Sequence, residues 1–365
     1  MLLPADRPVY CNLDHLNHDI IMQQFLESFL PAGPLVVFVF SIIPLMIILV
    51  YALFAIWLER KVAGHMQDRL GPMITGGWHG WAQTIADLLK MIQKEDIVPA
   101  KADRFLFKMA PFIAFAASYA AFVAIPFSSG YIGSMIDVGV FYIVAITSLL
   151  SVSIIMAGWA SNNKWSLLGA MRTAAQTVSY EIPIVVTILS VIIVTGTLNL
   201  MEVTELQSGN AFLGFLPSWL IFHSPFMVIA FLLFFIATLA EAHRVPFDLP
   251  ESESELVGGY QTEYSGMRWG LFMLTEYADM LLLSLLGAAL FFGGWNSPFG
   301  SFMDGPLWGA FWMLIKGMIL VFVMMWLRWT LPRLRVDQLM NLCWKYLIPL
   351  SFVNLVLIAL WEMIF

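Results

Sequence analysis

Long apolar stretches alternate with short polar connections along most of this chain. A helix that crosses the roughly 30 Å hydrocarbon core of a bilayer needs about 20 predominantly apolar residues, and eight segments meet this requirement. We expect these spans at about 35–58, 105–126, 138–160, 176–198, 219–240, 267–292, 307–329 and 342–363. The pattern therefore predicts an all-α integral membrane protein with eight transmembrane helices.

Among the connections, lysine and arginine are confined to every second one. The connections with basic residues within them or at their edges are 59–104, 161–175, 241–266 and 330–341, whereas those at 127–137, 199–218 and 293–306 have none. Because positively charged loops stay on the cytoplasmic side, we expect these four loops inside and both termini outside. A single membrane domain is then expected over 35–365, after an external N-terminal extension at 1–34. No cleavable signal peptide is expected, because the first residues lack its basic-then-apolar order.

The first cytoplasmic loop contains a helix of a different kind. Apolar residues recur there at spacings of three and four, with polar residues between them, and they are Trp78, Trp81, Ile85, Leu88 and Ile92. This pattern predicts an amphipathic helix at the membrane surface, with its tryptophans at the level of the lipid headgroups. A helix packed against other helices is the alternative.

Composition narrows the function. With 60% hydrophobic residues and a mean hydropathy of +0.82, the chain cannot be a soluble globule, and its net charge of −7 argues against a nucleic-acid partner. Cys11 and Cys343 are the only cysteines. We therefore expect no metal site or iron–sulfur cluster in this chain, so any redox centre must belong to a partner.

An acidic stretch at 241–264 interrupts the apolar pattern. It reads EAHRVPFDLPESESELVGGYQTEY, and Arg244 is its single arginine. Its carboxylates are Glu241, Asp248, Glu251, Glu253, Glu255 and Glu263. Pro246 and Pro250 prevent a continuous helix, and the apolar residues between the charges are not typical of a solvated tail. We therefore expect a folded loop.

Further carboxylates lie inside the predicted spans. Glu181 lies about two turns into the fourth span, where the alternative is an ordinary helix N-terminus that favours acidic residues and proline. Glu276 and Asp279 are three residues apart and share a face of the sixth span. With Glu241, they are predicted at similar depth beneath the acidic loop. Carboxylates grouped in a low dielectric repel one another and resist ionisation, so they should exchange protons when a nearby charge changes.

Three other ionisable residues are candidates. Lys316 lies near the middle of the seventh span and could either belong to a proton path or pair with a carboxylate. His243 is the first histidine to test because it lies beside Arg244. Arg69 lies in a turn shaped by glycine and proline, where it is either a positive-inside marker or holds a polar headgroup or an acidic partner.

Four stretches resemble one protein family. They are ERKVAGHMQDRLGP at 59–72, ADLLKMIQKEDIVP at 86–99, MRTAAQTVSYEIP at 171–183 and the acidic loop at 241–264. In this order they closely resemble the H subunit of proton-pumping NADH:quinone oxidoreductase, respiratory complex I, and the resemblance covers about 40–364. The N-terminal extension has no counterpart, and the family pattern implies an uncharged residue where Asp279 stands.

The resemblance implies a subunit of a translocase in the bacterial cytoplasmic (inner) membrane. Such a subunit forms a quinone tunnel with the peripheral arm and passes protons along carboxylates toward neighbouring membrane subunits. A ubiquinone-type quinone is its substrate, while FMN and iron–sulfur clusters belong to partner subunits. Carried over by motif, the residues that face the quinone are Arg69, Arg172, Arg244, Phe247 and Asp248. Those that couple protons are Glu181, Glu241, Glu251, Glu253, Glu255, Glu263 and Glu276.

Three other functions stay open at this point. The chain could be the homologous membrane subunit of an energy-converting hydrogenase, which lacks quinone, although Phe247 and its apolar surroundings favour quinone. It could be an autonomous ion or solute transporter, for which intramembrane carboxylates are equally suited, although no internal repeat supports this. It could also be a structural anchor whose acidic loop docks a basic partner.

Overall fold

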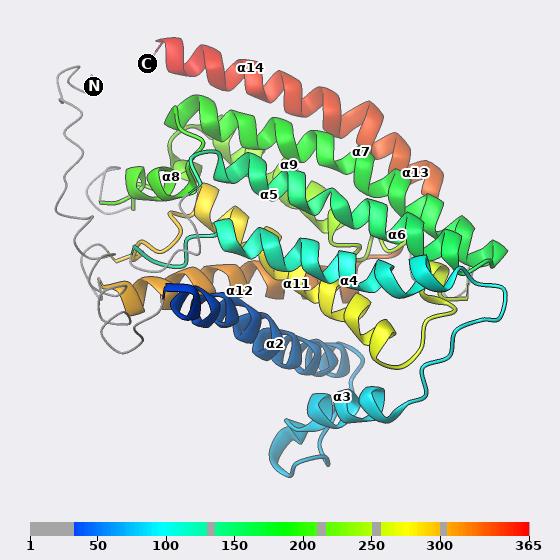
Figure 1. Cartoon of the computed structure of the whole chain (residues 1–365). Helices are drawn as coiled ribbons and strands as arrows, with labels where there is room; N and C mark the ends of the chain where they lie inside the picture. Colours follow the sequence, from blue (N-terminus) through cyan, green and yellow to red (C-terminus); the bar gives the residue numbers. More distant parts are fainter. Residues whose placement is uncertain (1–32, 130–135, 210–216, 250–256, 300–304, 365) are drawn as a thin grey trace.

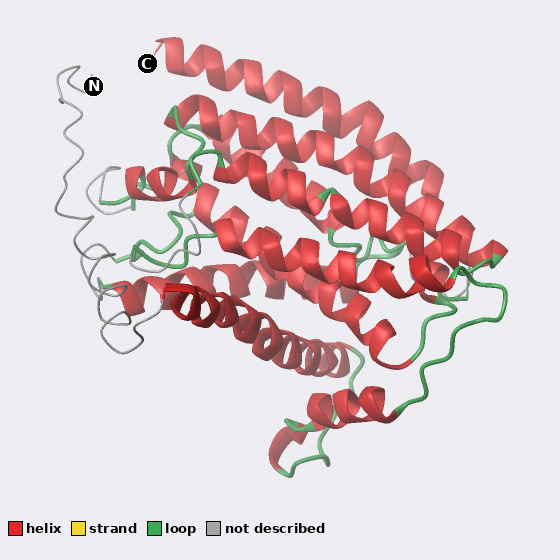
Figure 2. Ribbon diagram, viewed as in Figure 1, coloured by secondary structure: helices red, strands yellow, loops and turns green. Residues whose placement is uncertain are grey.

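The computed structural model describes residues 33–129, 136–209, 217–249, 257–299 and 305–364. Within these ranges the secondary-structure elements are all helical (Figure 2). Seven of the described helices are long and apolar enough to cross a membrane, and they are Ile42–Met66, Arg104–Ala124, Gly139–Ala160, Lys164–Thr195, Gly266–Phe291, Leu307–Thr330 and Val336–Ile364. The chain is therefore a multi-pass, all-α membrane protein. Another apolar helix, α9 (Pro225–Glu241), is shorter than the other seven.

Helix α11 (Gly266–Phe291) lies at the centre of the bundle (Figure 1). It packs against α2 (Gly33–Met66), α4 (Arg104–Ala121), α9 and α12 (Pro306–Thr330). Nearly all of its residues from Thr275 to Phe291 are buried. A helix enclosed by neighbours in this way can keep carboxylates away from lipid, which is the usual arrangement for ionisable groups at membrane depth.

The fourth span is longer than its hydropathy predicts. Helix α7 runs from Lys164 to Thr195, and the side chain of Asn163 caps its first turn by accepting a hydrogen bond from the Trp165 backbone N–H at 3.0 Å. Glu181 therefore lies well inside a helix, and the interpretation of this position as a helix start is wrong. The cause is that 164–175 has helix-forming but less apolar residues, which a hydropathy pattern assigns to a connection.

Three predicted spans contain an interruption. The third is divided at Ser148 into α5 (Gly139–Thr147) and α6 (Leu149–Ala160). The fifth consists of a 3-10 turn, Leu220–Phe222, followed by α9, which Ser224 caps. The last begins with α13 (Val336–Asn341), passes through a π-helical segment, Leu342–Leu347, and continues as α14 (Ile348–Ile364). Apolar composition predicts that a segment crosses the membrane but not where its hydrogen bonding changes.

The stretch predicted as a surface helix contains one α-helix, which is shorter than the predicted stretch. Helix α3 covers Gln83–Gln93 and lies beside the end of α2 (Figure 1). An irregular turn precedes it, because Gly76, Gly77 and His79 all have positive φ. Of the predicted apolar stripe, Trp78, Trp81, Ile85 and Ile92 are exposed in this chain. This face is therefore available to lipid or to another chain.

Lys316 of α12 binds the segment that follows α11. Its Nζ donates hydrogen bonds to the carbonyl oxygens of Phe292, Gly294 and Asn296 at 2.8, 2.8 and 2.6 Å. The ammonium group also lies 4.9 Å from the centroid of the Trp219 ring. Lys316 thus contacts backbone carbonyls beyond the C-terminus of α11, rather than the carboxylate that was the alternative expectation.

Candidate functional site

The chain turns sharply after α9, and one glutamine of α7 holds this turn. Gln176 is fully buried, and its Nε2 donates to the carbonyl oxygens of Ala240 at 2.7 Å and Phe247 at 2.8 Å. The two acceptors lie on either side of the proline-containing segment at 242–246. These two hydrogen bonds fix the positions of the residues between the acceptors, which include His243 and Arg244.

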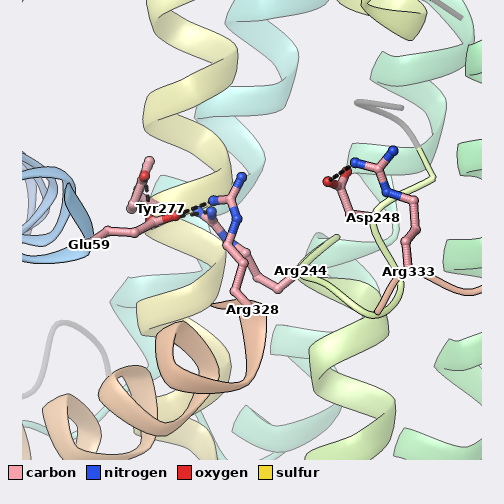
Figure 3. A network of polar contacts seen from close by, with 6 residues as sticks. All are labelled: Glu59, Arg244, Asp248, Tyr277, Arg328 and Arg333. Atoms are coloured by element: carbon pink, nitrogen blue, oxygen red, sulfur yellow. Dashed lines mark hydrogen bonds and ion pairs between the residues drawn. The ribbon is translucent and has the colours of Figure 1, made fainter. Parts of the chain in front are cut away.

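Arg244 enters a buried network around the carboxylate of Glu59 (Figure 3). Its Nη1 lies 3.5 Å from Glu59 Oε2, and its guanidinium carbon lies 4.5 Å from the centroid of the Tyr277 ring. Tyr277 Oη donates to the same Oε2 at 2.7 Å, and Arg328 Nη1 pairs with Glu59 Oε1. One carboxylate of α2 therefore joins α11, α12 and the loop after α9.

A second ion pair fixes the next part of the loop. Asp248 Oδ2 lies 3.0 Å from Arg333 Nη2 (Figure 3), and the Leu334 backbone N–H donates to the Pro246 carbonyl oxygen at 3.0 Å. The buried ring of Phe247 packs against Tyr180 of α7 at a centroid distance of 5.6 Å. The described residues 242–249 of this loop thus form a folded segment, as the sequence predicts.

His243 lies between α9 and Arg244 in a left-handed backbone conformation, with φ of 52°. It is 6% exposed, and its Nε2 has no hydrogen-bond partner among the described residues. Burial, reinforced by the positive charge of Arg244, lowers the pKa of His243 to about 4. The imidazole is therefore neutral at physiological pH.

A cavity of about 920 Å³ opens between α2, α3, α11 and the 257–265 segment. Charged residues of α2 and α3 line one part of its wall, namely Arg60, Asp87 and Lys90, and apolar residues of α3 and α11 line another, namely Met91, Trp269 and Met273. The Arg60 and Asp87 side chains form an ion pair at 2.5 Å that ties α3 to α2. A cavity of this shape presents both a polar and an apolar surface to one ligand.

Close packing against α7 places the 257–265 segment. A Cβ atom on Gly169 of α7 would lie only 2.7 Å from the Cα of Gly259, so the two backbones can meet this closely only because residue 169 is a glycine. Ser166 Oγ also donates to the Tyr260 carbonyl oxygen at 3.2 Å. This contact sets Tyr260 and Gln261 against α11.

Gln261 connects the cavity with the first carboxylate of α11. It lines the cavity, and its Nε2 donates to Glu276 Oε1 at 3.0 Å. Tyr260 Oη donates to the same oxygen at 3.3 Å. Gln261 and Glu276 are both buried. A single side chain, that of Gln261, therefore lies both at the cavity and within hydrogen-bond distance of Glu276.

Three helices bring further carboxylates together beyond Glu276. Glu241, the last residue of α9, is buried and interacts electrostatically with Glu181 of α7 and Asp279 of α11, and Thr147 donates a hydrogen bond to it. Asp279 follows Glu276 by one helical step of three residues, or about 4.5 Å along the axis. We call these four residues, Glu276, Asp279, Glu241 and Glu181, the carboxylate row.

Comparison with known proteins gives the family. The family model described as NADH dehydrogenase matches residues 38–359. This chain belongs to that family. It is 51% identical to the H subunit of the NADH-quinone oxidoreductase of Chlorobium luteolum, over 92% of this chain and 92% of the relative. It is 49% identical to the H subunit of Chlorobaculum tepidum, over 90% and 93% respectively, and 44% identical to that of Geobacillus thermodenitrificans, over 94% and 100%. The resemblance to the H subunits of complex I is thereby confirmed.

In this member of the NADH dehydrogenase family, the other predicted site residues have different surroundings. Arg69 is exposed, and its Nε donates to Gln67 Oε1 at 2.8 Å. Arg172 is half-buried on α7. Glu263 Oε1 accepts a hydrogen bond from Asn163 Nδ2 at 2.6 Å, which links the loop to the residue that caps α7. Three predicted residues lie outside the described residues, namely Glu251, Glu253 and Glu255.

Several residues of the site were not predicted as such from the sequence. Glu59 lies one position beyond the predicted end of the first span. The rule that selects carboxylates inside a span as functional candidates therefore missed it. Arg328 and Arg333 served only to orient the spans, and Tyr277 and Gln261 carry no signal of their own. Among the described residues of this NADH dehydrogenase family member, no group of three or more histidine, cysteine, aspartate or glutamate side chains could hold a metal ion.

Proposed function

We propose that this chain admits quinone into an NADH:quinone oxidoreductase complex and couples quinone reduction to proton translocation. The observation that carries the proposal is the hydrogen bond from Gln261, a residue of the cavity wall, to Glu276, the first member of the carboxylate row. Its relatives are named as subunits of an NADH-quinone oxidoreductase. Quinone is then a substrate, and the flavin and iron–sulfur clusters belong to partner subunits.

The mixed wall of the cavity suits a quinone. A quinone has an apolar tail that must leave the bilayer between helices, and a polar head. Met91, Trp269 and Met273 offer an apolar surface, and Arg60 and Lys90 offer donors and positive charge at the side of α3. In this proposal Arg69, Arg172, Arg244, Phe247 and Asp248 belong to the same path, where Arg244 and Asp248 hold its wall through their ion pairs.

Coupling follows from electrostatics. Each electron that arrives on the quinone adds negative charge, which attracts protons or arginine side chains and changes the ionisation of carboxylates close by. In this proposal the added charge changes the ionisation of Glu276, to which Gln261 is hydrogen-bonded. The ionisation of Glu241 and Glu181 then changes through the interactions within the carboxylate row. The acidic-loop residues Glu251, Glu253, Glu255 and Glu263 are part of this proton path in our proposal.

We also propose a topology for the assembled protein. Helix α9, with the 3-10 turn before it, makes an eighth crossing of the cytoplasmic membrane, which places both termini outside. The exposed tryptophans Trp78 and Trp81 lie at the headgroups of the inner leaflet, where such rings are favoured. The basic connections then face the cytoplasm and the peripheral-arm subunits of complex I.

The variant Gln261→Leu tests the connection between the cavity and the row. In the assembled complex, we expect quinone-dependent NADH oxidation to fall, while reduction of an artificial acceptor at the flavin stays at the parent level. The matched control is Gln93→Leu, the same substitution at an exposed glutamine of α3 outside the cavity wall, which should keep both activities. Parent-level quinone activity in Gln261→Leu and in Glu276→Gln would contradict the proposal.

Extraction in mild detergent separates this function from a lone transporter or a hydrogenase subunit. We expect the chain to co-purify with flavin- and iron–sulfur-containing subunits that oxidise NADH. Recovery of the chain alone, or with a hydrogen-evolving partner, would contradict the proposal. A photoreactive quinone should label α3 or the 257–273 region in the same preparation.

A further inference from the structure

Asp279 is a buried carboxylate in the central helix α11. It is 6% exposed and lies on the part of α11 that is enclosed on all sides. Ser118 of α4, itself buried, donates a hydrogen bond to Asp279 Oδ1 at 2.5 Å. Oδ2 has no hydrogen-bond partner among the described residues. A buried carboxylate oxygen with no donor is costly, so this atom requires an explanation.

The position of Asp279 in the carboxylate row explains why Oδ2 has no donor. Asp279 is one helical step beyond Glu276, on the same face of α11. It also interacts electrostatically with Glu241, as Glu181 does. Asp279 therefore lies between Glu276, one step before it on the same helix, and Glu241, with which it interacts.

We propose that Asp279 is a proton-carrying residue between Glu276 and Glu241, with Oδ2 as the atom that takes the proton. This inference rests on the function proposed above. A proton released by Glu276 converts the Asp279 carboxylate into a carboxylic acid. Its release to the Glu241 carboxylate returns Asp279 to its starting state, so charge and atoms balance over the cycle.

Ser118 is a positioning residue in this scheme. By donating to Oδ1 it fixes the carboxyl group in one rotation and leaves Oδ2 as the oxygen available for exchange. It also ties α4 to α11 at this depth. A single hydrogen bond therefore orients the carrier without blocking it.

A purely structural role for Asp279 predicts a different effect of the same substitutions. If Asp279 served only to accept the Ser118 hydrogen bond, Asp279→Asn would be tolerated, because the amide oxygen keeps the acceptor and almost the same shape. As a proton carrier, Asp279 would be disabled by the same substitution, because an amide does not take up a proton in this pH range. Asp279→Glu should retain part of the function.

The test uses the assembled complex reconstituted in proteoliposomes. We expect Asp279→Asn to lower quinone-dependent NADH oxidation and the accompanying acidification by about tenfold or more, the usual scale for loss of an acid–base group. Artificial-acceptor reduction should be unchanged, and Asp279→Glu and Ser118→Ala should lie between. A carboxyl C=O band in the reduced-minus-oxidised infrared difference spectrum should disappear in Asp279→Asn and shift in Ser118→Ala.

The variant Glu241→Gln distinguishes an error in the inference about Asp279 from an error in the proposed function. If Asp279→Asn keeps parent-level turnover, proton transfer and infrared bands while Glu241→Gln loses turnover, the inference about Asp279 is overturned and the proposed function stands. If both variants behave like the parent, the proposed function itself is wrong. Native electrophoresis of each preparation verifies that the compared complexes are fully assembled.

Discussion

Arg244 and Glu59 are 185 positions apart in the chain, yet they form an ion pair in the interior, with Arg244 Nη1 at 3.5 Å from Glu59 Oε2. Both side chains are buried, and Tyr277 contacts both (Figure 3). The loop after α9 is therefore anchored to the end of α2, whose next residue, Arg60, lines the cavity. This ion pair therefore connects the loop with the wall of the cavity.

Neutralising Glu59 should destabilise the protein. Glu59→Gln leaves the buried Arg244 and the neighbouring Arg328 without their shared carboxylate, and breaking a buried ion pair costs about 3–5 kcal/mol. We expect less assembled complex and a lower midpoint of thermal inactivation. The control Asp137→Asn changes an exposed carboxylate in the connection before α5 and should have little effect. An unchanged midpoint in Glu59→Gln would show that the pair does not stabilise the fold.

Gln176 should control the order of the turn after α9. Gln176→Leu removes the donor to the Ala240 and Phe247 carbonyl oxygens, at about 1–3 kcal/mol for each buried acceptor left unpaired. Amide hydrogen exchange in the 242–249 segment should become faster, and quinone-dependent activity should fall with it. Gln93→Leu on the exposed surface of α3 serves as the control. Unchanged amide hydrogen exchange in Gln176→Leu would contradict the role of Gln176 in fixing this turn.

His243 should make the protein sensitive to acid. Its folded-state pKa of about 4 lies below the ordinary value of 6.5, so the unfolded chain binds a proton more readily and stability is lost as pH falls from about 6.5 toward 4. The loss at pH 5 is about 2 kcal/mol. We expect His243→Gln to flatten the decline in thermal midpoint between pH 7 and 5. The control His65→Gln, at an exposed histidine, should show the same dependence of the thermal midpoint on pH as the parent. The same dependence in His243→Gln would contradict the assignment of the decline to His243.

Lys316 should act on stability rather than on proton transfer. Lys316→Met removes the donor to three backbone carbonyls beyond the end of α11, and each acceptor left unpaired costs about 1–3 kcal/mol. We therefore expect a lower midpoint of thermal inactivation with an unchanged ratio of protons moved to NADH oxidised. Lys316→Arg should keep part of the stability. A normal midpoint with a reduced ratio would assign Lys316 to the proton path instead.

Hydropathy was sufficient for the helical membrane fold, because burial in lipid requires long apolar segments whatever their neighbours. It failed where polar residues continue a helix, as at the start of α7, and where the hydrogen-bond pattern changes inside an apolar run, as at Ser148. At the start of α7, the capping residue Asn163 also donates to Glu263, which is 100 positions away and is not visible in a local pattern.

The candidate site was only partly visible in the sequence. Carboxylates are rare in apolar spans, so Glu181, Glu241 and Glu276 could be selected one by one, and the structure brings Glu181 and Glu241 into electrostatic contact. Glu276 is linked instead to Gln261, a neutral residue whose importance depends on the cavity at its side. A cavity between four elements has no counterpart in a linear pattern.

The most direct measurement of the central claim is the density of the intact complex with a bound quinone. The proposed function predicts quinone density in the cavity between α2, α3 and α11, in contact with Gln261, with the Gln261–Glu276 hydrogen bond preserved or exchanged for a contact to the ligand. Density for a partner polypeptide filling this cavity, with quinone entering at another face of the protein, would contradict it.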